Sequence, residues 1–259
     1  SATLLGAQNE SGVRLSMPII LTIEQIYYIF AFMLIVLEGL DGAGKSTQVR
    51  MFREYLESIS PDVKYIHFPR YDAPVYGGLI SKFLRGDFGA NDAVHPQLVA
   101  LLFAEDRRTA APEIRATVEA GGTVLLDRYV YSNIAYQCAK LPDDREAEEL
   151  RSWILDTEYG RFGLPRPDLN IFLDVPISFV RRSLEKQRNG ADREYLHGSR
   201  DIHEADLGFQ ERVREMYRRQ AAEDSSFITV DCGDDKGEML PPETIFNKIR
   251  RIYEDYTKA

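Results

Sequence analysis

The sequence predicts an α/β fold in which a five-stranded parallel sheet lies between two layers of helices. Five short, almost continuously apolar runs alternate with segments whose apolar residues recur at helical spacing, as expected for strands that helices cover on both faces. The chain has 259 residues, of which 44% are hydrophobic and 28% charged. This composition is typical of a globular protein with one sizeable core, so we expect a single domain.

The strands are expected where apolar residues run without interruption, at Leu34–Glu38, Val63–Phe68, Thr123–Asp127, Leu169–Asp174 and Phe227–Asp231. Helical spacing predicts helices at Ser46–Ile59, Gln97–Arg107, Glu113–Ala120, Ile177–Arg188, Asp206–Ala222 and Pro242–Tyr256. Ligands of such sheets bind beyond the carboxyl ends of the strands. The residues that follow each strand are therefore the candidates for function.

A glycine-rich segment follows the first predicted strand. It reads Gly39-Leu40-Asp41-Gly42-Ala43-Gly44-Lys45-Ser46 and fits the phosphate-loop pattern G-x-x-x-x-G-K-[ST]. The glycines let successive N–H groups face the phosphates of a nucleoside triphosphate, and the next helix adds its positive end. Lys45 would meet the β- and γ-phosphate charge, and the Ser46 hydroxyl is placed for Mg²⁺. These features predict a three-layer P-loop NTPase fold; the alternative is a glycine turn without a ligand.

Charged residues also follow other strands. Arg70 follows the second strand, Asp127-Arg128 ends the third, and Asp174 ends the fourth. Guanidinium groups are seldom buried without an anion. Two arginines at strand ends beside a phosphate loop therefore indicate a second phosphate site, although either could instead belong to a structural ion pair.

Four segments together resemble those of thymidylate kinases. They are Leu37 to Thr47 (LEGLDGAGKST), Phe68-Pro69-Arg70, Leu102 to Arg107 (LFAEDR) and Asp127 to Gln137 (DRYVYSNIAYQ). The similarity extends from Met33 to the C-terminus. It implies transfer of the ATP γ-phosphoryl group to the 5′-phosphate of dTMP, giving dTDP and ADP in dTTP biosynthesis, with Mg²⁺ as the cofactor.

The resemblance also implies which residues bind the substrates. ATP would contact Gly39, Leu40, Asp41, Gly42, Ala43, Gly44, Lys45, Ser46 and Thr47. The dTMP site would comprise Asp41, Phe68, Arg70, Phe103, Arg107, Arg128, Ser132, Asn133, Tyr136 and Gln137. Lys45, Asp41 and Arg128 would act in catalysis, and Ser46 and Asp41 would hold the metal ion.

Within the dTMP site, Phe103 would stack on the thymine ring, Arg107 would donate to its O4 edge, and Asn133 would read the remaining polar edge. Tyr136 would crowd the 2′ position and favour deoxyribose. Arg70 and Arg128 would clamp the acceptor phosphate. Without the resemblance, Phe103 on its apolar helix is expected to be a core residue, and Tyr129 and Tyr131 are expected to pack.

A lid of about residues 181–204 is expected to supply further charge. Thymidylate kinases place a catalytic arginine either in the phosphate loop or on a flexible lid, and the loop position here is Gly42. The resemblance therefore assigns this role to Arg188 and Arg193, which flank a predicted Asn189-Gly190 turn. The alternative, a solvated charge run, is the interpretation preferred for Arg181 and Arg182.

Composition and patterning limit the partners. A net charge of −9 and a pI near 5.1 argue against nonspecific nucleic acid binding. Cys138 and Cys232 lack metal or redox spacing and are expected to be reduced core residues of a cytoplasmic protein. The four histidines (His67, His95, His197 and His203) have no ligand spacing and are assigned no catalytic role. The resemblance implies a homodimer, and no membrane association is expected.

Residues 1–32 do not share the pattern of the rest of the chain. We expect an upstream leader or a start called too early, with the kinase domain at residues 33–259; a peripheral membrane or partner-binding helix is the alternative. Two other functions stay open at this point. One is a kinase for another nucleoside monophosphate or a deoxynucleoside, and the other is a catalytically silent nucleotide-binding module.

Overall fold

The computed structural model describes residues 33–185, 196, 201–204 and 206–258. One parallel sheet of five strands runs through the described part of the chain, in the order β2-β3-β1-β4-β5. The strands are β1 (Leu34–Gly39), β2 (Val63–His67), β3 (Thr123–Asp127), β4 (Leu169–Asp174) and β5 (Phe227–Asp231). The predicted α/β fold is confirmed, and each strand lies within one residue of its predicted bounds.

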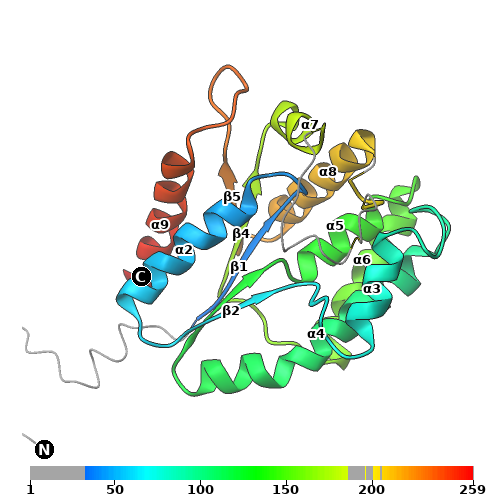
Figure 1. The fold of residues 1–259 in the computed structure, drawn as a ribbon. Coiled ribbons are helices and arrows are strands. Elements are labelled where there is room, and N and C mark those ends of the chain that lie inside the picture. Colours follow the sequence, from blue (N-terminus) through cyan, green and yellow to red (C-terminus); the bar gives the residue numbers. More distant parts are fainter. Residues whose placement is uncertain (1–32, 186–195, 197–200, 205, 259) are drawn as a thin grey trace, which may run out of the picture.

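Helices cover both faces of the sheet (Figure 1). Helices α2 (Lys45–Ile59) and α9 (Pro242–Lys258) pack against each other on one face. The other face carries α4 (Pro96–Glu119), α5 (Val130–Cys138), α6 (Asp144–Leu155) and α8 (Leu207–Glu223). Two short helices, α3 (Tyr76–Leu84) and α7 (Ile177–Glu185), lie beyond the carboxyl ends of the strands. Strands β1, β3 and β4 are buried throughout, so the core lies on both faces of the central sheet.

The two helices predicted at Gln97–Arg107 and Glu113–Ala120 are wrong as separate elements, because they form the single helix α4 with Pro112 inside it. Proline removes one backbone hydrogen bond and favours a break. Here Ala110, Ala111 and Ile114 on either side of the proline are completely buried. Their packing against the core holds the helix together across this position.

Helices α3, α5 and α6 were missing from the expected elements, as was η1 (Asp156–Arg161), a π-helical turn that continues α6. All nine residues of α5 are buried. A helix that is covered all round has no polar face and therefore no 3.6-residue alternation for a sequence pattern to detect. This helix carries much of the candidate site, so the site was placed by motif and not by periodicity.

Several smaller expectations can be compared with the structure. Cys138 and Cys232 are buried and free, as predicted. Tyr129 and Tyr131 are buried packing residues, also as predicted. Within the described ranges, no helix combines the length and the apolar character that crossing a membrane requires. Residues 1–32, Arg188, Arg193 and His197 lie outside the described residues.

Candidate active site

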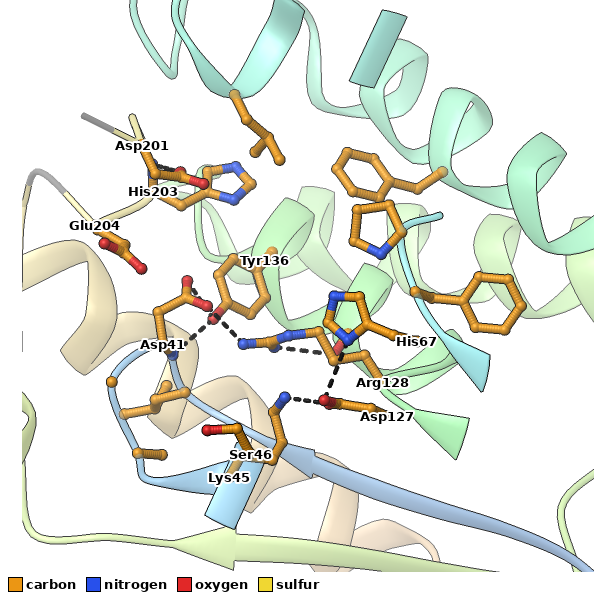
Figure 2. A pocket seen from close by; sticks show the side chains of 18 of the residues that line it. Asp41, Lys45, Ser46, His67, Asp127, Arg128, Tyr136, Asp201, His203 and Glu204 are labelled. Carbon is orange, nitrogen blue, oxygen red and sulfur yellow. Dashed lines mark hydrogen bonds and ion pairs between the residues drawn. The ribbon is translucent and has the colours of Figure 1, made fainter. Parts of the chain in front are cut away.

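A cavity of about 600 Å³ lies at the carboxyl ends of β1, β2 and β3 (Figure 2). Most residues that the sequence assigned to the site line this cavity: Leu40, Asp41, Gly42, Ala43, Gly44, Lys45, Ser46, Phe68, Phe103, Arg107, Arg128, Ser132, Asn133, Tyr136 and Gln137. Gly39, Thr47 and Arg70 do not line it. The edge of the sheet therefore brings together both groups of residues, those of the phosphate loop and those of the acceptor segments, as the parallel topology requires.

The phosphate loop turns from β1 into α2 through left-handed glycines. Gly42 has φ 72° and Gly44 has φ 70°, a region that side chains of other residues rarely adopt. A Cβ at Gly42 would lie 3.2 Å from Ser183 Oγ on α7, so this glycine also allows α7 to approach closely. Lys45 and Ser46 then begin α2, whose N-terminal N–H groups and dipole favour a phosphate at this end.

Lys45 forms a buried ion pair with Asp127 at the end of β3 (Figure 2). The other oxygen of Asp127 lies 3.1 Å from His67 Nδ1. Burial would raise the pKa of Asp127, but the charge of Lys45 and the contacts with His67 hold it well below the ordinary value of 3.8. Asp127 was expected among the charges at the strand ends, but no role was predicted for it from the sequence. The feature of the sequence that could have indicated a role for Asp127 is its position as the last residue of a buried strand.

Arg128 connects the phosphate loop to the acceptor side. Its backbone has φ 69°, which costs a non-glycine residue on the order of 1 kcal/mol. Its Nη1 donates to Gly39 O at 2.8 Å and its Nη2 to Asp41 Oδ1 at 2.6 Å. The guanidinium also lies 5.1 Å from the centre of the Tyr136 ring. Hydrogen bonds to the phosphate loop and the contact with Tyr136 of α5 therefore fix the position of the Arg128 guanidinium.

Asp41 accepts from two side chains of the acceptor half. Besides the Arg128 guanidinium, the Tyr136 hydroxyl donates to Asp41 Oδ2 at 2.8 Å and accepts from Asp41 N at 3.1 Å. Burial would raise the pKa of Asp41, but the charge of Arg128 outweighs it together with the other contacts, so that the pKa lies below its ordinary value. The carboxylate is therefore ionised at neutral pH.

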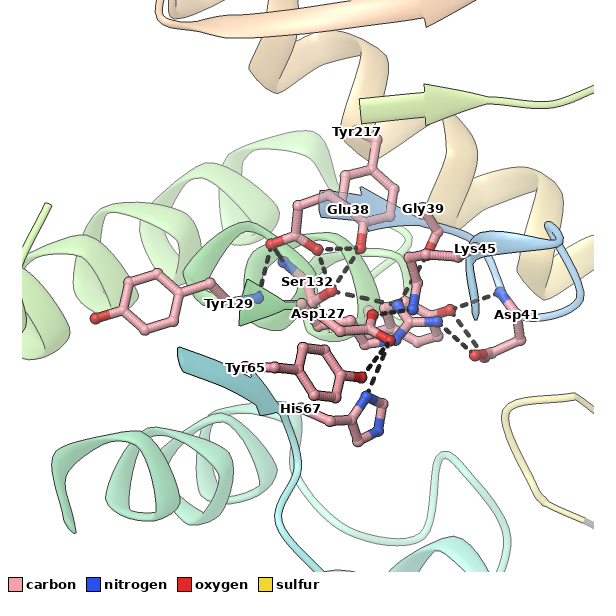
Figure 3. Close-up of polar contacts among 12 residues, drawn as sticks. Glu38, Gly39, Asp41, Lys45, Tyr65, His67, Asp127, Tyr129, Ser132 and Tyr217 are labelled. Atoms are coloured by element: carbon pink, nitrogen blue, oxygen red, sulfur yellow. Dashed lines mark hydrogen bonds and ion pairs between the residues drawn. The ribbon is translucent and has the colours of Figure 1, made fainter. Parts of the chain in front are cut away.

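Glu38 binds the turn between β3 and α5, where Figure 3 shows it beside Tyr129 and Ser132. This glutamate is completely buried and accepts from Tyr129 N at 2.9 Å, Ser132 N at 3.1 Å and the Tyr217 hydroxyl at 3.1 Å. The Ser132 hydroxyl also donates to it and accepts from Arg128 Nη1 at 3.2 Å. Burial raises the pKa of Glu38. Glu38 was not among the residues expected at the site, because its only distinguishing feature in the sequence is a charge inside an apolar strand.

The far end of the cavity holds Phe103, Arg107 and Asn133. Arg107 is paired with the buried Glu158 of η1, with Nε 2.5 Å from Oε2 and Nη2 2.8 Å from Oε1. Burial would lower the pKa of Arg107, but Glu158 raises it above its ordinary value. Phe103 packs edge-to-face on Phe83, with the ring centres 6.5 Å apart, and still lines the cavity. An aromatic face and a charged donor therefore meet at this end.

Arg70 lies beside the cavity and is bound to α4. Its Nε donates to Asp106 Oδ1 at 3.0 Å and its backbone N to Asp106 Oδ2 at 2.9 Å. Arg70 therefore forms a structural ion pair, the alternative expected from the sequence, and its role in phosphate binding stays a prediction. Asp174 likewise belongs to ion pairs, with Arg214 and Arg218, and does not line the cavity.

Residues 201–204 close another side of the cavity, where Asp201, His203 and Glu204 line it. His203 is buried, with its ring centre 5.1 Å from that of Tyr136. Burial lowers the pKa of His203 well below 6.5, and the charge of Lys140 adds to this effect, so the ring is neutral at pH 7. His67 and His203 were given no role from sequence, and the structure places both in the cavity lining.

The donor set of the cavity fits Mg²⁺. Asp41 and Ser46, the two residues assigned to the metal, both line the cavity and both offer oxygen. Among the residues that the structure describes, no group of three or more His, Cys, Asp or Glu side chains could hold a metal ion by itself. Mg²⁺ in phosphoryl-transfer sites is bound by few protein groups together with substrate phosphates and water, so two oxygen donors suffice.

Comparisons with known proteins agree with the geometry. The family model "Thymidylate kinase" matches residues 37–240. A thymidylate kinase of Mycobacterium tuberculosis is 35% identical over 217 residues, which cover 82% of this chain and 99% of the relative. One of Plasmodium falciparum is 31% identical, covering 76% of this chain and 81% of the relative.

A solved structure is also similar. The thymidylate kinase of Candida albicans matches with a TM-score of 0.64 and 28% identity, covering 86% of this chain and 91% of that one. The family model spans both halves of the cavity, from the phosphate loop to the segment that follows β5. The chain therefore belongs to the thymidylate kinase family, the ATP-dependent phosphotransferases that act on dTMP.

Proposed function

We propose that this chain transfers the γ-phosphoryl group of ATP to dTMP, giving dTDP and ADP, through the residues of the cavity described above. The observation that carries this assignment is that one cavity holds a phosphate loop and, facing it, an aromatic and arginine-lined pocket of the kind a nucleotide base requires. A 5′-phosphate oxygen of dTMP attacks the γ-phosphorus, and the bond from that phosphorus to the bridging oxygen of ADP breaks.

Alignment and charge neutralisation account for the catalysis, because the attacking phosphate oxygen is already anionic and needs no general base. The N–H groups of the phosphate loop and Lys45 hold the ATP phosphates. Arg128 holds the acceptor phosphate near the loop, with Arg70 in support. Arg188 and Arg193 are the proposed lid arginines that neutralise the equatorial oxygens of the transferring group.

The acceptor pocket would select a pyrimidine deoxynucleotide. Phe103 offers an aromatic face for the base, and Arg107 and Asn133 offer polar atoms for its edge. Tyr136 is held against Asp41 by two hydrogen bonds, so its ring cannot easily move aside for a 2′-hydroxyl. Mg²⁺, held by Asp41 and Ser46, would neutralise phosphate charge when bound.

The substrate range of the purified enzyme tests this function. ADP production is measured with Mg-ATP and, separately, dTMP, dUMP, UMP, dCMP and thymidine. We expect turnover with dTMP far above the others. Comparable turnover with thymidine or UMP would overturn the acceptor assignments, and the absence of turnover with all five would overturn the proposed function.

Three further properties are proposed with it. The chain is a homodimer of the cytoplasm, and residues 33–259 form its catalytic domain. Val75 just before α3, Leu79 on α3 and Leu98 at the start of α4 are exposed apolar side chains, which a second copy would cover. Light scattering of the full chain and of Leu98→Glu tests the dimer, which we expect the substitution to weaken.

Deletion of residues 1–32 tests the proposed boundary of the catalytic domain and should leave the kinase activity unchanged.

A further inference from the structure

Glu158 is a fully buried carboxylate behind the base end of the cavity. It lies in η1, is 0% exposed, and is not part of the cavity lining. Its two oxygens accept from Arg107, as described above, and Oε1 also accepts from Asn133 Nδ2 at 2.8 Å. One carboxylate thus contacts both polar residues at this end of the cavity.

These contacts fix the orientation of the Asn133 amide. Its Nδ2 has two partners, Glu158 Oε1 and Ala100 O at 3.0 Å, and neither of them can donate. The NH₂ group must therefore face them. Oδ1 of Asn133 is buried and has no partner within the described residues, although the residue lines the cavity. Asn133 consequently offers a ligand an acceptor and not a donor.

The same carboxylate fixes which donors of Arg107 remain. Nε and Nη2 point at Glu158, and a guanidinium has five N–H donors in one plane. The described part of the chain provides no hydrogen-bond partner for Nη1, and Arg107 lines the cavity. The base end therefore presents an acceptor from α5 and a donor from α4.

An acceptor beside a donor is complementary to a pyrimidine with an N3–H group next to a carbonyl, as in thymine and uracil. Cytosine has the reverse pattern, with a bare N3 next to an amino group. We propose that Glu158 is a positioning residue that sets the polarity of the Asn133 and Arg107 pair and thereby the preference for N3–H bases over cytosine. This inference rests on the proposed base contacts of these two residues.

Oε1 of Glu158 accepts from both Arg107 Nη2 and Asn133 Nδ2, and Oε2 accepts from Arg107 Nε, so only a carboxylate satisfies all three donors at once. In Glu158→Gln the side chain keeps its shape, but one of its two oxygens becomes an NH₂ group. If the NH₂ group takes the place of Oε2, it faces Arg107 Nε, and the guanidinium loses its two-point contact. If the NH₂ group takes the place of Oε1, it faces Asn133, whose amide must then turn Oδ1 toward it. Asn133 would present Nδ2 to the cavity, which is the polarity that suits cytosine.

The test is a competition between dTMP and dCMP in one reaction with Mg-ATP, in which the two products are separated and quantified. The ratio of the two kcat/KM values does not depend on how much of the enzyme is folded. We expect Glu158→Gln to lower this ratio by at least about tenfold, since mismatched buried polar groups give large discrimination. Glu149→Gln, an exposed residue of α6, is the matched control and should leave the ratio unchanged.

A second variant keeps the inference testable if Glu158→Gln does not fold. Glu158→Asp keeps the charge but is one methylene shorter, so it cannot contact Arg107 and Asn133 together, and the ratio should again fall. An unchanged ratio in either folded variant overturns the inference. If Asn133→Ala lowers the ratio while both Glu158 variants do not, only the role of Glu158 is refuted. If wild-type enzyme turns over dCMP as well as dTMP, the base contacts themselves are refuted.

Discussion

The two halves of the cavity are built in different ways. The phosphate loop consists of consecutive residues, and its shape comes from backbone conformation, with Gly42 and Gly44 in the left-handed region. The acceptor half is assembled from side chains far apart in the chain. They are held by pairs such as the buried pair of Arg107 with Glu158, 51 positions apart, and the half-buried pair of Arg128 with Asp41, 87 positions apart. A local motif can specify the first half, whereas the second depends on the whole fold.

The largest effect is expected where the two halves meet. Lys45→Ala should lower kcat by about 10²- to 10³-fold with little change in the KM for dTMP, because the lysine charge acts on the transferring phosphate. Steady-state ADP production measures both constants. Lys82→Ala, an exposed lysine of α3, is the control. A kcat within threefold of wild type would remove Lys45 from catalysis.

Asp127→Asn tests the ion pair that joins β3 to the loop. Leaving Lys45 buried without its partner should lower the free energy of unfolding at pH 7 by about 3 kcal/mol, as measured by urea denaturation.

The pH dependence of Asp127→Asn sharpens this test. The pKa of Asp127 in the folded protein lies below its ordinary value of 3.8. The ionised carboxylate therefore contributes stability that is present above about pH 4 and is lost as the pH falls through the folded-state pKa. Below pH 4 the stability of wild type should fall more steeply than that of the variant. Parallel curves would contradict the depressed pKa.

Arg70→Ala tests whether Arg70, which lies beside the cavity and not in its lining, contributes to binding of the acceptor phosphate. If Arg70 supports the acceptor phosphate, the KM for dTMP should rise about 10- to 50-fold while kcat changes little, which is typical of a lost charged hydrogen bond. Arg108→Ala, a surface arginine of the same helix that holds Arg70, is the control. An unchanged KM with reduced stability would make Arg70 a structural residue only.

The smallest effect is expected for backbone strain within the loop. Gly44→Ala forces a side chain onto φ 70°, where the added Cβ meets nothing closer than 3.9 Å, so strain alone is tested, at about 1 kcal/mol. Gly163→Ala is the matched control, with φ 61° and no atom within 4 Å of its Cβ.

Both glycine variants should lose similar stability. Only Gly44→Ala should raise the KM for ATP. If the strain of about 1 kcal/mol reduces the binding free energy of ATP, the KM should rise about fivefold. Equal effects on KM in both variants would show that the loop conformation has no special role.

The same contrast explains what the sequence could and could not reveal. The strands and the phosphate loop follow from apolar runs and one motif, and the structure confirms them. Helix α5 escaped detection because it is buried all round, and α4 was divided because Pro112 is a strong local signal that burial overrides. Family resemblance, not periodicity, placed Asn133 and Tyr136.

The residues whose roles at the site were not predicted from the sequence share a physical reason. Glu38, Asp127 and Glu158 are buried carboxylates whose partners lie on other elements. In the sequence each is an ordinary acidic residue, because what makes it important is a donor many residues away. Such groups become visible only when the fold brings the donor within hydrogen-bonding distance.

Among the residues that the structure describes, each lysine or arginine that lines the cavity is paired with a carboxylate: Lys45 with Asp127, Arg128 with Asp41 and Arg107 with Glu158. Arg70, beside the cavity, is paired with Asp106. An incoming anion therefore meets charges that are already balanced and must compete for them. Inorganic phosphate or sulfate brings charge alone, whereas a nucleotide adds an aromatic ring and a sugar. We therefore expect these internal ion pairs to weaken the binding of small anions more than that of a nucleotide, which gains further contacts from its base and sugar.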